Sequence, residues 1–484
     1  MGVGPDWMRG ADGEGENMWD DKPHEECGIF GIYAPGEDVA RLTFFALYAL
    51  QHRGQESAGI ATSDGHRVAV TTRLGLVSQA FTEEDLRGHG GPMAIGHTRY
   101  STAGSNQACN AGPIRAETDL GPIAVAHNGN VTNAYALRSE MEEQGERFVT
   151  STDSEVLTRL IARSPGTDLV GKVRRAMARM IGAYSLAILS RDRLIAVRDP
   201  LGVRPLCLGR LGQHWVTASE SCALATIGAE FVREIQPGEI IEIDETGCRS
   251  HGTGGEQRRP AMCLFELIYF ARPDSVIHGQ RLHLVRQRMG EQLAAECPVD
   301  ADVVVGLPDS AVPAAIGYAR ASGILYAEAL IKNRYIGRTF IQPDQRLRET
   351  GVSLKFNVLP EVVEGKRVIL VDDTIVRGTT SRPIVQLLRG AGAKEVHMRV
   401  HAPPMMWPCY LGVDLARREE LIAARMTVPE IGRFIGADSI GYLSLEGLLS
   451  AIDAPGAGFC TGCLTGNYPV PVQLGLDKLI LERV

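Results

Sequence analysis

Residues 368–381 join an apolar run to two adjacent acids, a glycine and three hydroxyl side chains, in the order VILVDDTIVRGTTS. The apolar run is typical of a buried strand, and a helix is expected to begin at the hydroxyls. Ligands of open α/β sheets bind beyond the carboxyl ends of the strands, where the N–H groups of a helix start suit a phosphate. The acid pair can accept hydrogen bonds from a ribose diol or bind Mg²⁺. We therefore predict a phosphate site on a parallel sheet; the alternative is a solvated turn.

The order of strands and helices divides the chain of 484 residues, which is too long for one ordinary domain. A Gly-rich, charged linker is expected at 250–260. The segment 27–245 has many strands and few helices, which is typical of a layered sandwich. Its expected strands are 57–62, 66–72, 93–98, 122–126, 184–189, 193–198 and 239–243, and its expected helices are 39–50, one from Asp153 and one over 172–180.

After the linker, strands alternate with helices, which predicts a parallel, doubly wound α/β sheet. The expected strands are 302–308, 368–373 and 394–400, and the expected helices are 311–321 and one ending at Leu388.

Composition excludes several classes of protein. Lys plus Arg is 50 against 58 for Asp plus Glu, a net charge of −8, which argues against a nucleic-acid binder. No apolar run approaches the roughly 18 residues of a membrane-spanning helix, and residues 1–26 lack the apolar centre of a secretory signal. Ten cysteines are too few for a disulfide scaffold, so a reduced cytoplasm is the expected location.

Residues 1–26 are polar and unpatterned, and the sequence changes sharply at Cys27, which opens the strand-like run CGIFGIYAP. If the leader is removed, Cys27 gains a free α-amine with a pKa of about 8, close to the roughly 8.5 of its thiol. That amine can act as general base for the thiol without a separate histidine. A cysteine buried in the core is the alternative interpretation.

Five motifs follow one another in the first part: CGIFGIYA, QHRGQESAGIA, IGHTRYSTAG, AHNGNVTN and STDSE. Together they resemble the glutamine amidotransferases of the N-terminal nucleophile class, whose fold is an αββα sandwich of the α+β type. The resemblance implies that Cys27 is the nucleophile, that Arg99 pairs with the α-carboxylate of glutamine and that Asp153 binds its α-ammonium. It also implies an oxyanion hole from the Asn128 side chain and the Gly129 N–H. By itself, Asn-Gly could be only a hairpin turn.

The second part resembles the type I phosphoribosyltransferases. The resemblance implies that the acid pair holds the ribose hydroxyls of phosphoribosylpyrophosphate (PRPP), that the turn in GLPDSAVPAA (306–315) binds pyrophosphate, and that KNRYIGRTF (332–340) is a mobile loop over PRPP. Taken alone, the last segment could be a solvated basic loop. The implied PRPP-binding residues are Asp372, Asp373, Thr374, Arg377, Gly378, Thr379, Thr380, Ser381, Lys332, Arg334 and Arg338, and the implied Mg²⁺ site is Ser310, Asp372 and Asp373.

Both parts together, with YFARPDS at 269–275, resemble the glutamine phosphoribosylpyrophosphate amidotransferase family. The resemblance implies a propeptide at 1–26, a glutaminase domain at 27–258, a phosphoribosyltransferase α/β domain at 259–450 and a tail at 451–484. The implied enzyme is a pentosyltransferase that passes ammonia from glutamine to PRPP, the first committed step of de novo purine synthesis. Feedback by AMP, ADP, GMP or GDP and a homotetramer are also implied, with no membrane or nucleic-acid partner.

The sequence argues against three rival functions. An asparagine synthetase would need an SGGxDS-type ATP loop, and a glucosamine-phosphate synthase would carry sugar-isomerase domains; neither pattern is found. A regulator that only binds PRPP or purine nucleotides would not require the nucleophile Cys27.

Four cysteines form a separate group. Cys460-x-x-Cys463 is a metal-chelating pair, whereas Cys263 and Cys409 are distant in sequence. All four match the positions at which one branch of the resembled family, the branch with a leader, binds a structural [4Fe–4S] cluster. Zinc and four reduced thiols stay open as alternatives. The remaining cysteines are expected to be structural: Cys109, Cys207, Cys222, Cys248 and Cys297.

Overall fold

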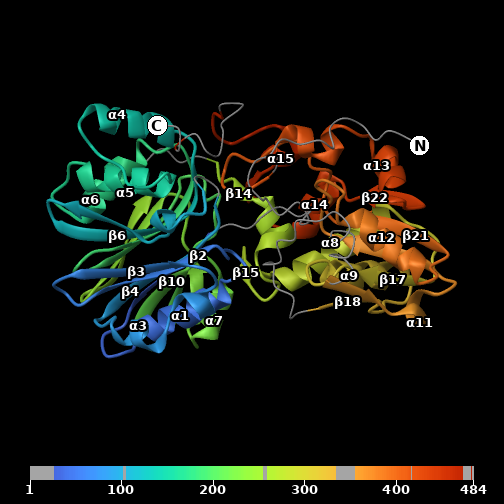
Figure 1. Cartoon of the computed structure of the whole chain (residues 1–484), viewed down its shortest axis with the longest axis horizontal. Helices are drawn as coiled ribbons and strands as arrows, with labels where there is room; N and C mark the ends of the chain where they lie inside the picture. Colours follow the sequence, from blue (N-terminus) through green and yellow to red (C-terminus); the bar gives the residue numbers. More distant parts are fainter. Residues whose placement is uncertain are drawn as a thin grey trace.

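The computed structural model describes residues 27–101, 105–253, 259–333, 355–415, 417–472 and 481. The predicted propeptide, residues 254–258 of the predicted linker, and Arg334 and Arg338 lie outside these residues. The chain forms two lobes side by side, the first coloured blue to green and the second yellow to red in Figure 1.

The first lobe contains two antiparallel sheets stacked face to face. The seven-stranded sheet has the order β11-β9-β10-β1-β4-β2-β3 and the six-stranded sheet the order β13-β12-β8-β7-β6-β5. Their bounds are β1 (Gly28–Tyr33), β2 (Ser57–Ser63), β3 (Val68–Leu74), β4 (Met93–Arg99), β5 (Ile114–Thr118), β6 (Gly121–Val131), β7 (Gly182–Leu189), β8 (Leu194–Arg198), β9 (Cys207–Leu211), β10 (His214–Ala218), β11 (Glu230–Glu234), β12 (Glu239–Asp244) and β13 (Gly247–Thr253).

Alternating side chains explain the layers. Successive residues of a strand point to opposite faces, so Ile29 of β1 packs between the two sheets, whereas Phe30 packs under the helices on the outer face. Helices α1 (Val39–Ala49) and α7 (Ser221–Thr226) cover the first sheet. Helices α4 (Ala134–Glu143), α5 (Asp153–Arg163) and α6 (Leu169–Met177) cover the second. The predicted αββα sandwich is therefore confirmed.

Two local expectations were wrong at their edges. The helix expected over 172–180 begins at Leu169, because the Asp168 side chain accepts a hydrogen bond from the Gly171 N–H at 2.7 Å and caps the helix start. The linker expected from 250 begins later, because β13 continues through Thr253, paired with Glu239.

The second lobe is built on a parallel sheet of order β17-β20-β21-β22, as the doubly wound pattern predicted. Its strands are β17 (Val303–Gly306), β20 (Arg367–Asp372), β21 (Glu395–Val400) and β22 (Ser439–Tyr442). A smaller pair joins β18 (Leu330–Lys332) to β19 (Phe356–Val358). The helices are α8 (Leu282–Glu296), α9 (Val312–Ser322), α11 (Pro360–Val363), α12 (Ser381–Gly390), α13 (Val428–Ile435) and α14 (Leu445–Ile452).

The segment that leaves the first lobe is tied to both lobes and to the chain end. Strand β14 (Met262–Cys263) pairs in parallel with β23 (Phe459–Cys460). Backbone N–H groups of Ala261 and Cys263 donate to first-lobe carbonyls at 2.8 and 3.0 Å. The chain then forms a π-helical turn at Glu266–Phe270, the short strands β15 (Val276–Ile277) and β16 (Gln280–Arg281), and α8. The two lobes are thus joined by hydrogen-bonded structure.

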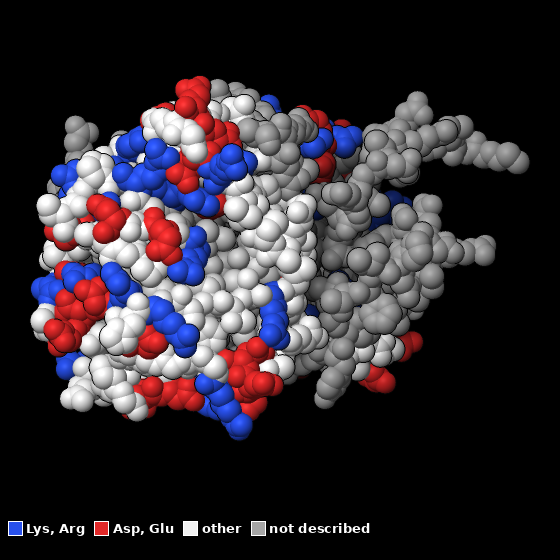
Figure 2. Space-filling view, turned by 60° about the vertical axis from the view of Figure 1, so that its left-hand side comes forward, with Lys and Arg blue, Asp and Glu red and all other residues white. Residues whose placement is uncertain are grey.

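Charges of both signs intermingle on the side of the molecule shown in Figure 2. Ion pairs among the described residues include Arg163 with Glu146 at 2.6 Å and Arg193 with Glu242 at 2.5 Å. Within the described ranges, no helix is both long enough and apolar enough to span a membrane.

Candidate active sites

Cys27 lies at the start of β1, beside the paired residues Gly28 and Thr98 of β1 and β4. Its thiol donates to the Tyr100 carbonyl at 3.5 Å, and the residue is 7% exposed. Burial raises the pKa of this thiol to about 11, although the Tyr100 hydrogen bond and the Arg99 charge oppose that shift. A nucleophile here therefore needs a base to remove its proton.

Two charges of opposite sign lie near this thiol. Arg99 ends β4 and is buried, with Nη1 3.5 Å from Glu56 Oε2. Asp153 opens α5, and its Oδ2 accepts from the Val131 N–H at 2.9 Å. Arg99 lowers and Asp153 raises the pKa of Cys27, as charges close to a thiol do. The structure thus brings together the predicted nucleophile and both predicted glutamine-binding side chains.

Asn128 and Gly129 do not form a hairpin turn, which corrects that alternative. They lie inside β6, where they pair with Ser185 and Tyr184 of β7. Gly129 has a φ of 149°, and a Cβ there would lie 2.0 Å from the Ala183 carbonyl oxygen. Only glycine tolerates both this positive φ and this close approach of the neighbouring strand. The Asn-Gly pair therefore lies in a distorted part of strand β6.

The Asn128 amide is fully buried and weakly held. Its Nδ2 donates to Ser219 Oγ at 3.5 Å, and its Oδ1 has no hydrogen-bond partner within the described part of the chain. Ser219 Oγ also accepts from the Ile29 N–H at 3.0 Å. Asn128 is thereby placed near the start of β1, and its amide is available to a ligand.

The phosphate loop of the second lobe follows β20, as predicted. Asp372 and Asp373 are buried, and the Asp373 N–H donates to Asp372 Oδ1 at 2.8 Å. The Asp373 carboxylate accepts hydrogen bonds from Ser310 Oγ and, at 2.9 Å, from Thr374 Oγ1. The structure therefore brings Ser310 to the acid pair from a separate strand–helix turn.

The rest of the loop leads into α12. Gly378 takes a positive φ of 77°, and α12 begins at Ser381 just after Thr380. Thr379 Oγ1 is buried and lacks a hydrogen-bond partner among the residues described. A buried hydroxyl without a protein partner beside a helix start suits an anionic oxygen.

The two described basic residues of the predicted PRPP site are paired. Arg377 donates to Glu420 Oε2 at 2.7 Å. Lys332 ends β18, and its Nζ lies 2.9 Å from Asp309 Oδ2, in the turn of segment 306–315. The structure therefore joins the start of the predicted basic loop to the predicted pyrophosphate turn.

The four grouped cysteines meet where the chain end crosses the domain junction. Cys263 stands directly opposite Cys460 in the β14–β23 pair, and Cys463 follows in α15 (Gly462–Thr465). Burial raises the pKa of Cys263 to about 12, and the nearby Cys460 and Cys409 thiols contribute. Burial likewise raises the pKa of Cys463, with contributions from the other three thiols. Tertiary structure thus unites the distant pair with the CxxC.

The segment after Cys409 also contacts the first lobe. Asn130 Nδ2 donates to the Tyr410 carbonyl at 2.9 Å, and Leu411 N–H points to Cys409 Sγ at 3.3 Å. Across the described ranges, no three His, Cys, Asp or Glu side chains are grouped so as to hold one metal ion.

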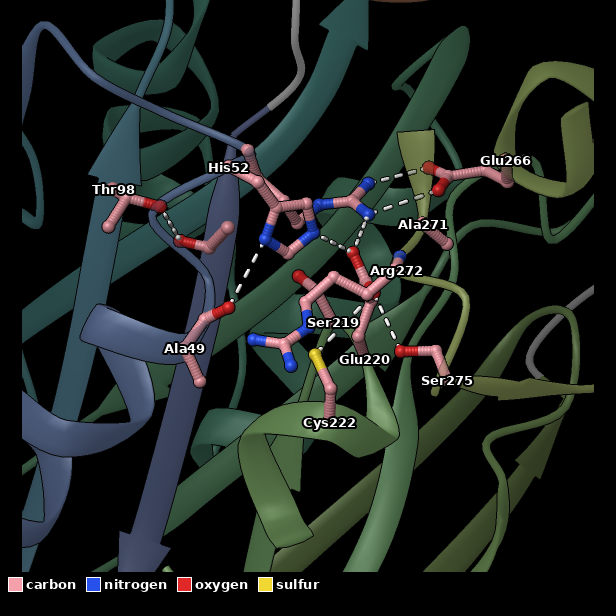
Figure 3. Close-up of polar contacts among 12 residues, drawn as sticks. Ala49, His52, Thr98, Ser219, Glu220, Cys222, Glu266, Ala271, Arg272 and Ser275 are labelled. Atoms are coloured by element: carbon pink, nitrogen blue, oxygen red, sulfur yellow. Dashed lines mark hydrogen bonds and ion pairs between the residues drawn. The ribbon is translucent and has the colours of Figure 1, made fainter. Parts of the chain in front are cut away.

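A buried charge network lies beneath Cys27 and involves none of the predicted site residues except Cys27 itself. Arg53 donates from Nε to the Cys27 carbonyl at 3.2 Å, from Nη1 to Glu220 at 2.5 Å and from Nη2 to Glu266 at 2.6 Å. Figure 3 shows Glu220 and Glu266 approaching this network from different segments. Arg53 stands in the QHRGQ motif, but 213 residues separate it from Glu266, so spacing gives no signal of the contact.

Known proteins resemble both lobes of this chain. A family model described as a glutamine amidotransferase domain matches residues 97–226, and one described as a phosphoribosyl transferase domain matches residues 281–402. An amidophosphoribosyltransferase of Synechococcus elongatus is 51% identical over 472 residues, which cover 96% of each chain. One from Archaeoglobus fulgidus is 51% identical over 451 residues, covering 92% of this chain and 98% of that one.

Two solved structures match the fold over nearly its whole length. A structure described as the allosteric regulatory enzyme of purine biosynthesis has a TM-score of 0.89 and 45% identity, covering 93% of this chain and 98% of that chain. A glutamine PRPP amidotransferase from B. subtilis, complexed with ADP and GMP, has a TM-score of 0.88 and 45% identity. The match covers 93% of this chain and 99% of that chain. With both lobes matched in one polypeptide, this chain belongs to the amidophosphoribosyltransferase family.

Proposed function

We propose that the chain transfers the amide nitrogen of glutamine to PRPP, giving 5-phosphoribosylamine, pyrophosphate and glutamate. The observation that carries this proposal is the presence of two sites in one chain: Cys27 with Arg99 and Asp153 in the first lobe, and the acid pair with its hydroxyl loop in the second. The product would commit the cell to de novo purine synthesis.

In the first site, Arg99 binds the α-carboxylate of glutamine and Asp153 its α-ammonium, which places the amide carbon at Cys27. Sγ attacks that carbon, and the oxyanion is stabilised by the Asn128 amide and the Gly129 N–H. Collapse of the tetrahedral intermediate releases ammonia and leaves a thioester, which water cleaves to glutamate. The long 3.5 Å hydrogen bond from Asn128 Nδ2 to Ser219 Oγ supports this role, because so weakly held a donor can turn to an oxyanion.

Removal of residues 1–26 by cleavage between Glu26 and Cys27 would supply the missing base. The freed α-amine accepts the thiol proton as Sγ attacks and returns it to the departing ammonia. The need for such a base is supported by burial, which raises the pKa of the thiol to about 11 in the chain that retains its leader.

In the second site, Asp372 and Asp373 accept hydrogen bonds from the ribose hydroxyls of PRPP, and the 5-phosphate lies against Thr374, Arg377 and the residues Gly378 to Ser381. Lys332, Arg334 and Arg338 would contact the pyrophosphate; the two arginines lie outside the described residues. Ammonia attacks C1 with inversion and pyrophosphate leaves.

Ser310, Asp372 and Asp373 provide the oxygen ligands that Mg²⁺ prefers, and the contact of Ser310 with Asp373 supports their joint use. When bound, Mg²⁺ would neutralise charge on the leaving pyrophosphate. Because free ammonia would be protonated or lost in bulk water, we expect a closed passage between the two sites.

A [4Fe–4S] cluster held by Cys263, Cys409, Cys460 and Cys463 is a further part of the proposal. The donor types fit such a cluster, because Cys263 pairs with Cys460 across β14 and β23 and the thiols of Cys263, Cys409 and Cys460 all act on the buried Cys463 thiol. Its role would be structural, fixing the chain end to the junction of the lobes. Iron and sulfide analysis tests this: about four of each should be lost in Cys463→Ser but kept in the control Cys297→Ser. Zinc, or no metal in the wild type, would contradict it.

Regulation, assembly and location complete the proposal. A related enzyme was solved with ADP and GMP, so we propose that AMP, ADP, GMP or GDP inhibits this chain by occupying the phosphate loop. We also propose a homotetramer. The ten cysteines, all within the described residues, form no disulfide, which supports a cytoplasmic location.

The test of the reaction is a paired assay on anaerobically purified protein from which residues 1–26 have been removed. Glutamate and pyrophosphate are followed together after addition of glutamine, PRPP and Mg²⁺. Equal release is expected, and Cys27→Ala should abolish glutamate release while pyrophosphate release continues with added ammonia. Cys248→Ala, a half-buried cysteine on β13, is the matched control. Neither product from the wild type would leave a PRPP-binding regulator as the better explanation.

A further inference from the structure

Three buried charged residues connect the nucleophile to the second lobe. Arg53, which binds the Cys27 carbonyl, donates to Glu220 of the first lobe and to both carboxylate oxygens of Glu266 in the second. All three residues are at most 2% exposed. An arginine that satisfies two carboxylates at once fixes both in place, so the Cys27 backbone and the π-helical turn at Glu266–Phe270 share one guanidinium.

Glu220 strengthens the same junction from the first lobe. Its Oε2 accepts from the Arg272 N–H at 2.9 Å and from Ser275 Oγ at 2.7 Å, both in the second lobe (Figure 3). Its Oε1 also lies 2.6 Å from His52 Nε2. Burial opposes the ionisation of Glu220, but His52 and Arg53 outweigh it and hold its pKa well below the ordinary value.

Arg286 extends the network to the phosphate loop. It lies on α8 and is 1% exposed, with hydrogen bonds from Nε to the Leu267 carbonyl at 2.9 Å and from Nη2 to the Ala271 carbonyl at 2.7 Å. It therefore holds the π-helical turn that carries Glu266. The charges of Asp373, Glu220 and Glu266 all act on this guanidinium. The same π-helical turn also contacts the strand end that carries the acid pair, because the His401 N–H donates to the Asp372 carbonyl at 3.0 Å and His401 Nε2 lies 3.5 Å from the Ile268 carbonyl oxygen.

We propose that Arg53, Glu220 and Glu266 are positioning residues through which PRPP bound at the Asp372–Ser381 loop sets the geometry of Cys27. An anion beside Asp373 changes the field at Arg286, which holds the turn bearing Glu266. Movement of Glu266 is passed by Arg53 to the Cys27 carbonyl, because a buried ion pair cannot break without leaving an uncompensated charge. The inference rests on the proposed function and names the physical route that would make glutamine hydrolysis depend on PRPP.

The test compares Glu266→Gln with the wild type and with the control Glu239→Gln. Glu239 is also a buried carboxylate paired with an arginine, Arg233 at 2.8 Å, but its hydrogen-bond partners Arg233, Gln236 and Ser250 all lie in the first lobe. Three quantities are measured: glutamine hydrolysis with and without PRPP, the rate of Cys27 alkylation by iodoacetamide with and without PRPP, and ammonia-dependent release of pyrophosphate.

PRPP should stimulate hydrolysis about tenfold or more in the wild type and in Glu239→Gln, within the usual range of coupling between sites. In Glu266→Gln, the stimulation should fall below about twofold, and PRPP should no longer change the alkylation rate. Its ammonia-dependent activity should stay within about threefold of the wild type, because the phosphate loop keeps its own contacts. Ser275→Ala is a milder change that removes one hydrogen-bond donor to Glu220, and it should reduce the stimulation by PRPP at least about threefold. It replaces Glu266→Gln as the test variant if that variant does not fold.

Different results would contradict the inference and the proposed function. Full stimulation in both Glu266→Gln and Ser275→Ala would overturn the inference alone, as would a loss of ammonia-dependent activity equal to the loss of hydrolysis, which would indicate a merely structural role. A wild type that hydrolyses glutamine equally well without PRPP would also overturn it and leave the transfer reaction intact. A wild type that hydrolyses no glutamine even with PRPP would contradict the proposed function itself.

Discussion

Replacing Gly129 with alanine should separate the two activities of the chain. The new methyl group would lie 2.0 Å from the Ala183 oxygen and 2.9 Å from Tyr184 Cα, on the neighbouring strand β7. Ordinary contact begins at 3.4 Å, so β6 and β7 would have to separate by about 1.4 Å at this point. The residue would also have to leave its φ of 149°.

The expected loss follows from that displacement. A shift of about 1 Å in a catalytic group costs roughly 100-fold in rate, and loss of one oxyanion donor costs roughly 100- to 1000-fold, or about 2.7–4 kcal/mol. Gly129→Ala should therefore lower kcat/KM for glutamine hydrolysis by at least about 100-fold. Ammonia-dependent release of pyrophosphate should stay within about twofold, because the second lobe does not contain the distorted strand.

Gly247→Ala is the matched control for this variant. Gly247 also has a positive φ, 117°, but its added methyl group would meet no atom within 4 Å. It carries the backbone strain without the collision, so glutamine hydrolysis should be unchanged. Hydrolysis within about fivefold of the wild type in Gly129→Ala would refute the role assigned to this strand, and parallel loss of both activities would show general unfolding instead.

Three further perturbations test the sites separately. Asp372→Asn should raise the KM for PRPP about 10- to 100-fold in the ammonia-dependent reaction, the value of one or two charged hydrogen bonds; an unchanged KM would remove Asp372 from the ribose site. Burial lowers the pKa of His97 from 6.5 to about 3, so the unfolded chain takes up a proton that the folded chain cannot. His97 should therefore lower the free energy of unfolding by about 2.5 kcal/mol between pH 7 and 4.5. In urea unfolding, the free energy of unfolding of His97→Gln should fall by about 2.5 kcal/mol less than that of the wild type over this pH range. In the chain that retains residues 1–26, alkylation of Cys27 should rise about tenfold per pH unit from pH 7 to 10, because burial raises its pKa to about 11; a plateau near pH 8.5 would contradict this.

The local sequence was enough to predict the strand before the acid pair, the start of helix α5 and the fold of the first lobe. The apolar run before Asp372 could only be a buried strand, and the acid pair had to emerge at its carboxyl end. Helix α5 begins at Asp153 because the Thr152 hydroxyl caps it, accepting from the Glu155 N–H. The order of five short motifs was enough to predict the αββα sandwich through family resemblance.

Helix α8 and the Asn-Gly pair show where local patterns failed. No helix was predicted over Leu282–Glu296. The buried face of α8 includes Arg286 and Gly290 while Leu284 is exposed on the other side, which weakens the apolar stripe. Packing against α9 and α14 nevertheless makes this segment helical. Asn-Gly is a strong turn signal, but here Gly129 serves the close approach of two strands inside a sheet. In both cases packing against distant segments overrode the local preference.

The sequence by itself determined which residues could act as nucleophile, as charge partners and as phosphate loop, because each role depends on residue type and immediate neighbours. Only the tertiary structure decided what joins them. Cys263 meets Cys460 through a two-residue strand pair, and Arg53 meets Glu266 across 213 residues. Such contacts leave no periodic signal, because their distance in space is set by the packing of the two lobes against each other and not by spacing along the chain.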